Sequence, residues 1–250
     1  MLNILLSGAC GRMGKMVAAC AESDENTKII AGVDIFGGNA DFPIYKSFSE
    51  VKEKADVIID FSSADALDSI LDYCEKTGTP AVLCATGYKE SQLNKIRTVS
   101  EKCAMFRSSN MSLGVNLLCG LVKKAALILG TDFDIEIIEK HHNQKLDAPS
   151  GTAIMLADSI NTVFDDKMNY EYDRHTKRAK RTKNEIGLHA VRGGTIVGEH
   201  DVIFAGPDEV ITLSHSAQSR EIFARGALLA GKFMKDKKNG MYNMNDVFDF

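Results

Sequence analysis

Residues 141 to 153, "HHNQKLDAPSGTA", combine side chains that can exchange protons with a turn that can bind an anion. His141 titrates near neutral pH and Lys145 carries an ammonium group, so either residue can move a proton in a reaction. Pro149 and Gly151 are typical of a turn that begins a helix, where exposed N–H groups favour a carboxylate. The pattern therefore predicts an anion site with a proton donor beside it.

Two other interpretations fit this string when it is taken alone. A zinc site would need further ligands, and the sequence has neither paired cysteines nor an HExxH helix, so no metal is expected. A polar turn between a strand and a helix, with two exposed histidines, is as common an explanation as catalysis. Motifs elsewhere in the sequence are needed to distinguish a catalytic loop from a polar turn.

A glycine loop lies near the start of the chain, in "LNILLSGACGRMGKMV". Gly8, Gly11 and Gly14 have the spacing GxxGxxG, close to the GxGxxG fingerprint of dinucleotide-binding proteins, and Cys10 occupies a position where that fingerprint has glycine. An apolar strand precedes the loop and a helix pattern follows it. Asp34 ends the next strand, where an acid can bind a ribose hydroxyl. An ordinary glycine-rich turn is the alternative, but the context favours dinucleotide binding.

The residues after Asp34 bear on the choice between NADH and NADPH. "IFGG" follows it, without the Arg or Lys that meets a 2′-phosphate in NADPH-binding proteins. We therefore expect NADH to be favoured over NADPH, with Lys15 and Lys46 as alternative phosphate contacts. Behind a domain that binds such a cofactor, His141 and Lys145 are interpreted as the acid/base pair of a hydride transfer.

The first part of the chain alternates apolar strands with helix patterns at Arg12–Glu22, Ala64–Thr77 and Lys89–Lys102, which predicts a parallel sheet with helices on both faces. Ligands bind beyond the carboxyl ends of such strands. Small polar residues gather at three of these ends, "DFSSA", "CATGY" and "SSNMS". Helix capping by Ser62, Ser63 or Thr86 is an alternative explanation that is compatible with cofactor contact.

The regular alternation of strand and helix patterns ends after the helix pattern Val115–Leu129. Four strand patterns follow with one helix, Thr152–Val163, among them, which predicts a second domain with an antiparallel or mixed sheet. The expected fold class is α/β: a Rossmann-type domain over 1–112 and a smaller α+β domain for substrate and oligomerisation over 113–219. A last helix, Arg220–Met234, is expected to return with 220–250 to the first domain.

Bulk composition narrows the function classes. The 250 residues have a net charge of −4, so the charge of the whole protein does not attract it to nucleic acid or to an anionic membrane. Three observations lead us to expect a cytoplasmic protein: six cysteines without a CxxC pair, which we interpret as buried apolar residues in a reducing compartment, the absence of a signal-peptide pattern and the absence of any stretch approaching a transmembrane span. The segment "RHTKRAKRTK" (174–183) has basic residues at helical spacing. We interpret it as a solvated helix face, with nucleic-acid binding as the alternative.

Three stretches, "GACGRMG", "EKHHNQKLDAPSGTA" and "VRGGTIVGEHDVIFAG", together resemble the 4-hydroxy-tetrahydrodipicolinate (dihydrodipicolinate) reductase family. The resemblance extends to the final "SREIFARGALLA". It implies a Rossmann domain and a smaller mixed α/β domain that binds substrate and builds a homotetramer. It also implies that NADH or NADPH reduces a dicarboxylate, (2S,4S)-4-hydroxy-2,3,4,5-tetrahydrodipicolinate, to tetrahydrodipicolinate with loss of water. A related aspartate or amino-acid dehydrogenase is the rival within oxidoreductases.

The resemblance also implies roles for single residues. His141 matches the proton donor or acceptor, and Lys145 matches the proton donor. Ile35 stands where many members have a basic residue after the ribose-binding acid, which strengthens the expectation of NADH. The substrate-binding positions match His142, Lys145, Gly151 and Thr152. The cofactor positions match Gly8, Ala9, Cys10, Gly11, Arg12, Met13, Asp34, Cys84, Ala85, Thr86, Ser108, Ser109, Asn110 and Met111.

Overall fold

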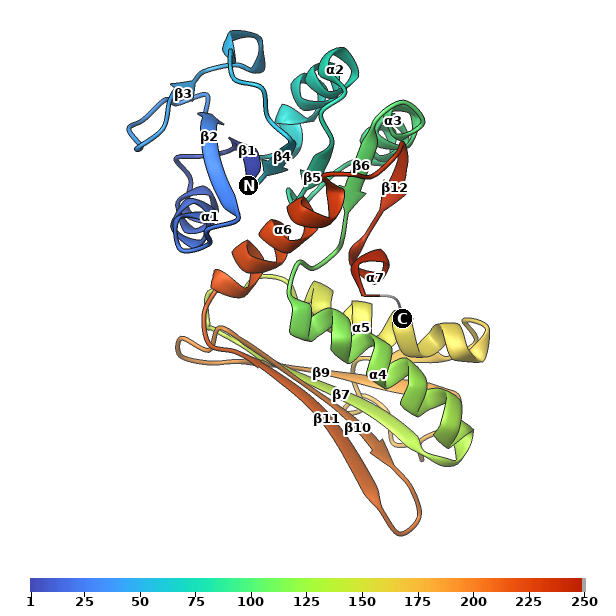
Figure 1. The fold of residues 1–250 in the computed structure, drawn as a ribbon. Coiled ribbons are helices and arrows are strands. Elements are labelled where there is room, and N and C mark those ends of the chain that lie inside the picture. Colours follow the sequence, from blue (N-terminus) through green and yellow to red (C-terminus); the bar gives the residue numbers. More distant parts are fainter. Residues whose placement is uncertain (249–250) are drawn as a thin grey trace. The chain divides into compact units, whose positions relative to one another are not determined.

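The computed structural model describes residues 1–248 and consists of two compact units. The first unit combines Met1–Ser112 with the segment that begins at Glu221, and the second unit is Leu113–Arg220. Figure 1 follows the chain by colour: blue to green strands and the red helix α6 belong to the first unit.

A seven-stranded sheet forms the centre of the first unit, and all its neighbouring strands run parallel, in the order β12-β6-β5-β4-β1-β2-β3. The apolar runs make its inner strands because both faces are buried. The order reverses between β1 and β4, which creates a switch point where ligands bind in such sheets. The strands are β1 Leu2–Ser7, β2 Thr27–Val33, β3 Ile44–Tyr45, β4 Val57–Asp60, β5 Ala81–Leu83, β6 Ala104–Arg107 and β12 Gly240–Tyr242.

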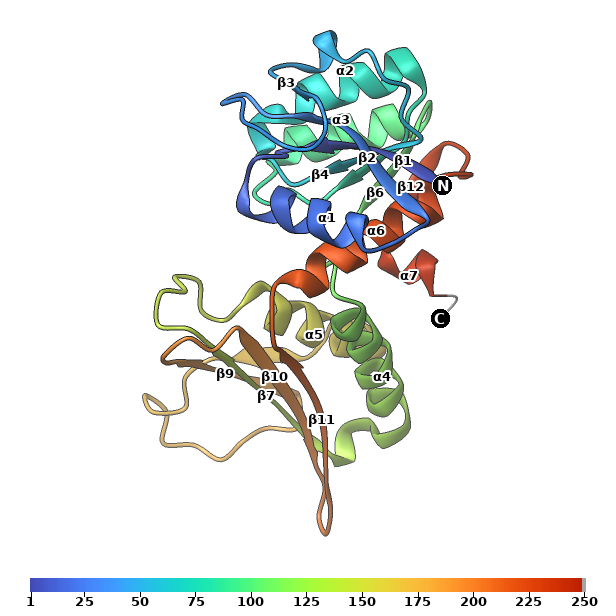
Figure 2. The same ribbon diagram turned by 60° about the vertical axis from the view of Figure 1, so that its left-hand side comes forward.

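Two pairs of helices cover the two faces of this sheet, as Figure 2 shows. On one face, α1 (Arg12–Glu22) and α6 (Glu221–Met234) enclose a core that includes Ile4, Val17 and Ala227. On the other face, α2 (Leu67–Thr77) and α3 (Glu90–Ser100) enclose a second core. Short elements complete the unit: η1 Phe48–Glu50, η2 Ala64–Ala66 and α7 Met244–Val247.

The second unit is a five-stranded mixed sheet with α4 (Leu113–Leu129) and α5 (Gly151–Asn161) on one face (Figures 1 and 2). The strand order is β11-β10-β7-β9-β8, in which β7 pairs antiparallel with β10 and parallel with β9. Its third core lies between the sheet and these helices. The strands are β7 Asp134–His141, β8 Asn169–Glu171, β9 Glu185–Arg192, β10 Gly198–Ala205 and β11 Val210–Ala217, and two short helices are η3 Gly130–Asp132 and η4 Thr162–Phe164.

The predicted fold class, a Rossmann-type parallel sheet with a smaller mixed-sheet unit, is confirmed. The sequence patterns did not reveal β3, β8 or β12. These strands are two or three residues long, so no run of alternating or apolar residues announces them.

The basic segment 174–183 forms a loop, so the expected helical stripe is wrong. Arg174 and Arg181 instead bind Glu136 of β7, at 2.7 and 3.1 Å. Lys177 pairs with Glu171. Carboxylates of the sheet therefore neutralise much of the positive charge, which weakens the case for nucleic-acid contact through this segment.

The helical stretch Leu113–Asp132 is long and apolar enough to cross a membrane by length and composition, which corrects the expectation that no segment approaches this limit. Core helices of globular proteins can have the same length and composition. Leu118, Val122 and Ala126 of this helix are buried in the core of the second unit.

Candidate active site

The residues predicted to hold a cofactor all follow strands of the first unit. Gly8 to Met13 follow β1, Asp34 follows β2, Cys84 to Thr86 follow β5, and Ser108 to Met111 follow β6. Because these strands are parallel, the residues lie at one edge of the sheet, around the switch point between β1 and β4. Ala9 and Met111 differ from the others, because their side chains are buried in the core of this unit.

The glycine loop has a geometry that only glycine allows. Gly8 has φ +72°, and a Cβ there would lie 2.8 Å from the carbonyl oxygen of Phe61. A Cβ on Gly14 would lie 2.2 Å from the carbonyl oxygen of Gly8. Gly11 is the N-cap of α1 and provides no side-chain capping bond to the first N–H groups of that helix. The loop and helix start fit a pyrophosphate, which needs close backbone approach and N–H donors.

Asp34 ties the glycine loop to the end of β2. Its carboxylate accepts the Cys10 N–H at 2.9 Å and the Phe36 N–H at 3.1 Å. A carboxylate has about four acceptor positions, so capacity for ribose hydroxyls is left. Ile35 and Phe36 follow with exposed side chains, 70% and 90% respectively, and neither can bind a phosphate.

Asp60 at the end of β4 is a buried carboxyl group that the sequence did not single out. It accepts hydrogen bonds from the backbone and hydroxyl of Ser62, at 3.0 and 2.5 Å. Burial raises the pKa of Asp60, and the bonds from Ser62 oppose this. The alternative of helix capping is not supported by the side-chain bonds: Ser62 binds Asp60, Ser63 occupies the N-cap position of η2 without a side-chain capping bond, and Lys89 rather than Thr86 is the N-cap of α3.

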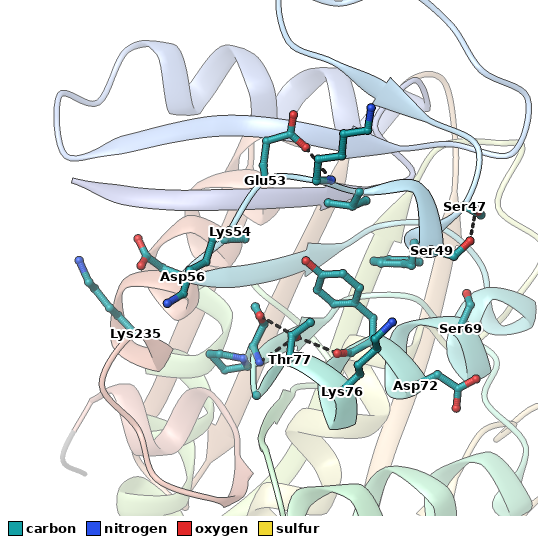
Figure 3. A pocket seen from close by; sticks show the side chains of 18 residues that line it. Ser47, Ser49, Glu53, Lys54, Asp56, Ser69, Asp72, Lys76, Thr77 and Lys235 are labelled. Carbon is teal, nitrogen blue, oxygen red and sulfur yellow. Dashed lines mark hydrogen bonds between the residues drawn. The ribbon is translucent and has the colours of Figure 1, made fainter.

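The first unit also has a hollow of about 770 Å³ away from this edge, shown in Figure 3. It lies where Asp56 and Pro80 precede β4 and β5, at the amino ends of the strands. Side chains of both charges surround it, so no single sign of ligand is favoured: Lys54, Lys76 and Lys235 with Glu53, Asp56 and Asp72. None of the residues predicted to hold the cofactor lines this hollow.

The predicted acid/base residues lie in the second unit, at and after the end of β7. His141 is the last residue of the strand and is buried, whereas His142 is half-buried and begins the loop. Lys145 lies in that loop, where its ammonium pairs with Asp147 at 2.9 Å. The loop leads into α5, whose N-cap Ser150 accepts a hydrogen bond from the Ala153 N–H through its side chain. Gly151 has nothing within 4 Å of its Cβ position, and Thr152 follows it in the first turn.

His141 belongs to a buried polar network around Glu139. Its Nδ1 lies 2.6 Å from the Glu139 carboxylate, which is fully buried and also binds Arg192 through both oxygens at 2.7 Å. His200 of β10 packs edge-to-face on the His141 ring with the ring centres 5.2 Å apart, and its Nε2 lies 3.1 Å from the hydroxyl of Ser150.

The network sets protonation states. Burial would raise the pKa of Glu139, but hydrogen bonds from Arg192, His141 and the backbone of Ser150 hold it below its ordinary value. Burial lowers the pKa of His141, against the opposing effect of Glu139, so the ring is neutral at neutral pH. Burial, together with the neighbouring His141, lowers the pKa of His200 to about 4. Glu139 is thus ionised, and both histidines are uncharged.

Glu139, Asp147, Arg192 and His200 are site residues that sequence reasoning missed. For Glu139 a signal existed: in "DIEIIEKH" it shares one face of the strand with Ile135, Ile137 and His141. A carboxylate on an otherwise buried face needs partners, which would have marked it as part of a site.

We expect His200 to make the stability of the protein depend on pH. Because its pKa is about 4 in the folded chain and near 6.5 unfolded, its contribution is complete above pH 6.5 and is lost toward pH 4. The loss amounts to about 3 kcal/mol. Urea unfolding at several pH values should show a shallower slope between pH 7 and 4 for His200→Gln than for the original chain. The exposed His175→Gln is the control, and equal slopes in all three proteins would contradict the prediction.

The chain matches both parts of one protein family. Residues 2–111 match "Dihydrodipicolinate reductase, N-terminus" and residues 114–248 match "Dihydrodipicolinate reductase, C-terminus". The 4-hydroxy-tetrahydrodipicolinate reductase of Caldanaerobacter subterraneus subsp. tengcongensis is 53% identical over 247 residues, which cover 99% of this chain and 98% of the relative. The enzyme of the same name from Clostridium tetani is 49% identical over 98% of this chain and 96% of the relative.

Solved structures agree on the fold. A dipicolinate-bound dihydrodipicolinate reductase from Paenisporosarcina sp. TG-14 has a TM-score of 0.81 and 23% identity, and the match covers 99% of both chains. An aspartate dehydrogenase from Thermotoga maritima has a TM-score of 0.53 and 12% identity over 95% of this chain and 98% of that one. The family resemblance that the sequence motifs indicated is thereby confirmed, and the chain belongs to the dihydrodipicolinate reductase family.

Proposed function

We propose that the protein reduces (2S,4S)-4-hydroxy-2,3,4,5-tetrahydrodipicolinate to tetrahydrodipicolinate, consuming one reduced nicotinamide cofactor and one proton and releasing water. This reaction serves lysine and diaminopimelate biosynthesis. The observation that carries the proposal is the loop after β7: a neutral His141 and a cationic Lys145 lead directly into the start of α5. The relatives with this name match the chain over nearly its whole length.

The first unit holds the cofactor in this proposal. When bound, the cofactor supplies the hydride. The turn Gly8 to Met13 and the start of α1 would bind its pyrophosphate, and Asp34 would bind the adenosine ribose. Cys84 to Thr86 and Ser108 to Met111 would line the remaining edge, with Met111 contributing main-chain atoms only. NADH is favoured, since Asp34 is followed by two apolar side chains and no cation.

The second unit holds the dicarboxylate. The N–H groups at the start of α5, at Gly151 and Thr152, favour one carboxylate of the substrate. His142 and the Lys145 ammonium add hydrogen-bond donors beside this helix start. Gly151 matters here because a side chain at this position would occupy the space over the helix end.

Lys145 and His141 have different roles in the proton transfer. Lys145 is the donor, since its ammonium carries a proton that it can deliver to the reduced ring. The Nδ1–H group of His141 donates to the Glu139 carboxylate, so Nε2 carries no proton and can accept a hydrogen bond or a proton. His141 can therefore take a proton from solvent or substrate and return it, which is the donor/acceptor role expected from the family resemblance.

We also propose a cytoplasmic homotetramer. The helices of the second unit cover only one face of its five-stranded sheet. The other face carries half-buried apolar side chains such as Ile138 and Ile203 together with the Lys140 ion pairs. Such a face is typical of a surface that another sheet can cover.

A steady-state assay with enzymatically generated substrate tests the reaction and the cofactor preference together. We expect turnover with NADH, and a KM at least about tenfold higher for NADPH, because a 2′-phosphate beside Asp34 costs on the order of 1.4 kcal/mol or more. Aspartate with NAD⁺ is the matched assay for the rival dehydrogenase. Turnover of aspartate but not of the dipicolinate precursor would refute the proposed function.

A further inference from the structure

We propose that Glu139 and Arg192 are positioning residues that fix the tautomer and the orientation of the His141 imidazole. The proposal rests on the proposed function in so far as His141 transfers protons. The residues come from neighbouring parallel strands: Glu139 precedes His141 on β7, and Arg192 is the register partner of His141 on β9. Neither residue needs to touch the substrate or the cofactor for this role.

Every side of the Glu139 carboxylate is occupied. One oxygen accepts from the Ser150 N–H at 3.0 Å and from Arg192 Nη2 at 2.7 Å. The other lies 2.6 Å from His141 Nδ1 and accepts from Arg192 Nη1 at 2.7 Å. A fully buried carboxylate with a bidentate arginine is ionised, so it can only accept, and the proton must lie on Nδ1 of His141. Nε2 is thereby left as the acceptor.

Arg192 connects this carboxylate to the loop that carries Lys145. Its guanidinium also donates to the carbonyl of Asp147 at 2.6 Å, and Asp147 in turn pairs with the Lys145 ammonium. Glu139 therefore joins three parts of the site: the His141 ring, the first residue before α5, and the loop between them. A single bidentate ion pair, between the buried Glu139 and the half-buried Arg192, keeps these parts in one arrangement.

The charges around His141 act in opposite directions. Glu139 on β7 raises the pKa of His141, whereas Lys145 in the loop and Arg192 on β9 lower it. His200 on β10 faces the ring as a neutral group, and Asp147 partly neutralises Lys145. Removing Glu139 should therefore lower the pKa of His141 further, and removing Arg192 should raise it. Loss of structure alone would give no such pair of opposite shifts.

The test uses Glu139→Gln and Arg192→Gln in the full chain, with nitrogen NMR of the histidine rings in the absence of substrate. In the original protein the Nδ1–H tautomer of His141 should dominate. Glu139→Gln should lose this dominance and move the His141 titration to lower pH, and Arg192→Gln should move it to higher pH. In the assay, kcat should fall about 10- to 100-fold for Glu139→Gln, with NADH affinity unchanged.

Glu136→Gln is the matched control. Glu136 lies on the same strand but the opposite face, where it accepts from His189 Nε2 at 2.7 Å and from two arginines. This change should leave the His141 tautomer and titration in place. Unchanged His141 spectra in Glu139→Gln, or an equal change in Glu136→Gln, would overturn the proposal. If Glu139→Gln does not fold, Arg192→Gln still tests the sign of the shift. Because the spectra need no turnover, failure of the proposed reaction is seen separately, in the assay of the original protein.

Discussion

Replacing Lys145 with methionine is expected to lower kcat about a thousandfold, within the range for loss of a general acid. The methionine side chain is unbranched and only one atom shorter than that of lysine, but it cannot deliver a proton or bind a carboxylate. His141→Gln should lower kcat less, about a hundredfold, since Lys145 remains as a proton source. The affinity for NADH should stay the same in both variants, because the glycine loop belongs to the other unit. Steady-state kinetics and titration of NADH fluorescence give the two quantities.

The chain offers a closely matched control for Lys145. Lys167 also pairs with an aspartate two residues away, at 3.1 Å from Asp165, compared with 2.9 Å for Lys145 and Asp147. Lys167→Met removes the same charge and the same kind of ion pair from an exposed surface of the second unit. Its kcat should equal that of the original protein. A Lys145→Met variant that kept kcat within a factor of about three would remove Lys145 from the proton transfer.

Gly14→Ala is expected to weaken NADH binding about a hundredfold, because a displacement of about 1 Å in a site can cost that much. The added Cβ would lie 2.2 Å from the Gly8 carbonyl oxygen and 2.7 Å from that of Ala9. Both contacts are with backbone, so the loop itself must move away from α1. The dissociation constant for NADH, measured by titration, is the quantity to compare.

Gly11→Ala provides a graded comparison for this variant. Its Cβ would meet only the Gly8 carbonyl oxygen, at 3.2 Å, and its φ of −69° suits any residue. NADH affinity should therefore fall much less than in Gly14→Ala. Thermal unfolding without cofactor separates binding from folding, since overpacking at Gly14 also costs about 1–3 kcal/mol. Equal dissociation constants for the two variants would show that the close contact at Gly14 does not shape the cofactor loop.

Local patterns were sufficient for much of the first unit. Arg12–Glu22 begins and ends as a helix where its pattern predicts, because apolar and small residues recur at helical spacing directly after the glycine loop. The glycine motif and Asp34 were found because their spacing reflects local backbone geometry. The family of the chain was also readable, since the string around His141 and Lys145 is specific.

Long-range pairing explains what the sequence did not reveal. Glu136 and Glu139 look alike in "DIEIIEKH", yet their odd separation places them on opposite faces of β7. The partner that makes Glu139 part of the site, Arg192, lies 53 residues later in the chain. The helical stripe predicted for the basic segment was wrong for the same reason. Arg174 binds Glu136, which lies 38 residues earlier in the chain, and a local pattern of residues cannot reveal such a contact.

The divided make-up of the first unit has a consequence for folding during synthesis. Residues 1–112 leave the ribosome long before α6, which follows the whole second unit. Until then, the sheet face that α6 covers exposes apolar side chains such as Ile59 and Phe106 to water. A burial of this kind is worth about 1.5–3 kcal/mol per large side chain. We therefore expect the first unit to complete its core only after α6 has been synthesised. The second unit is continuous in sequence, so it can bury its core earlier.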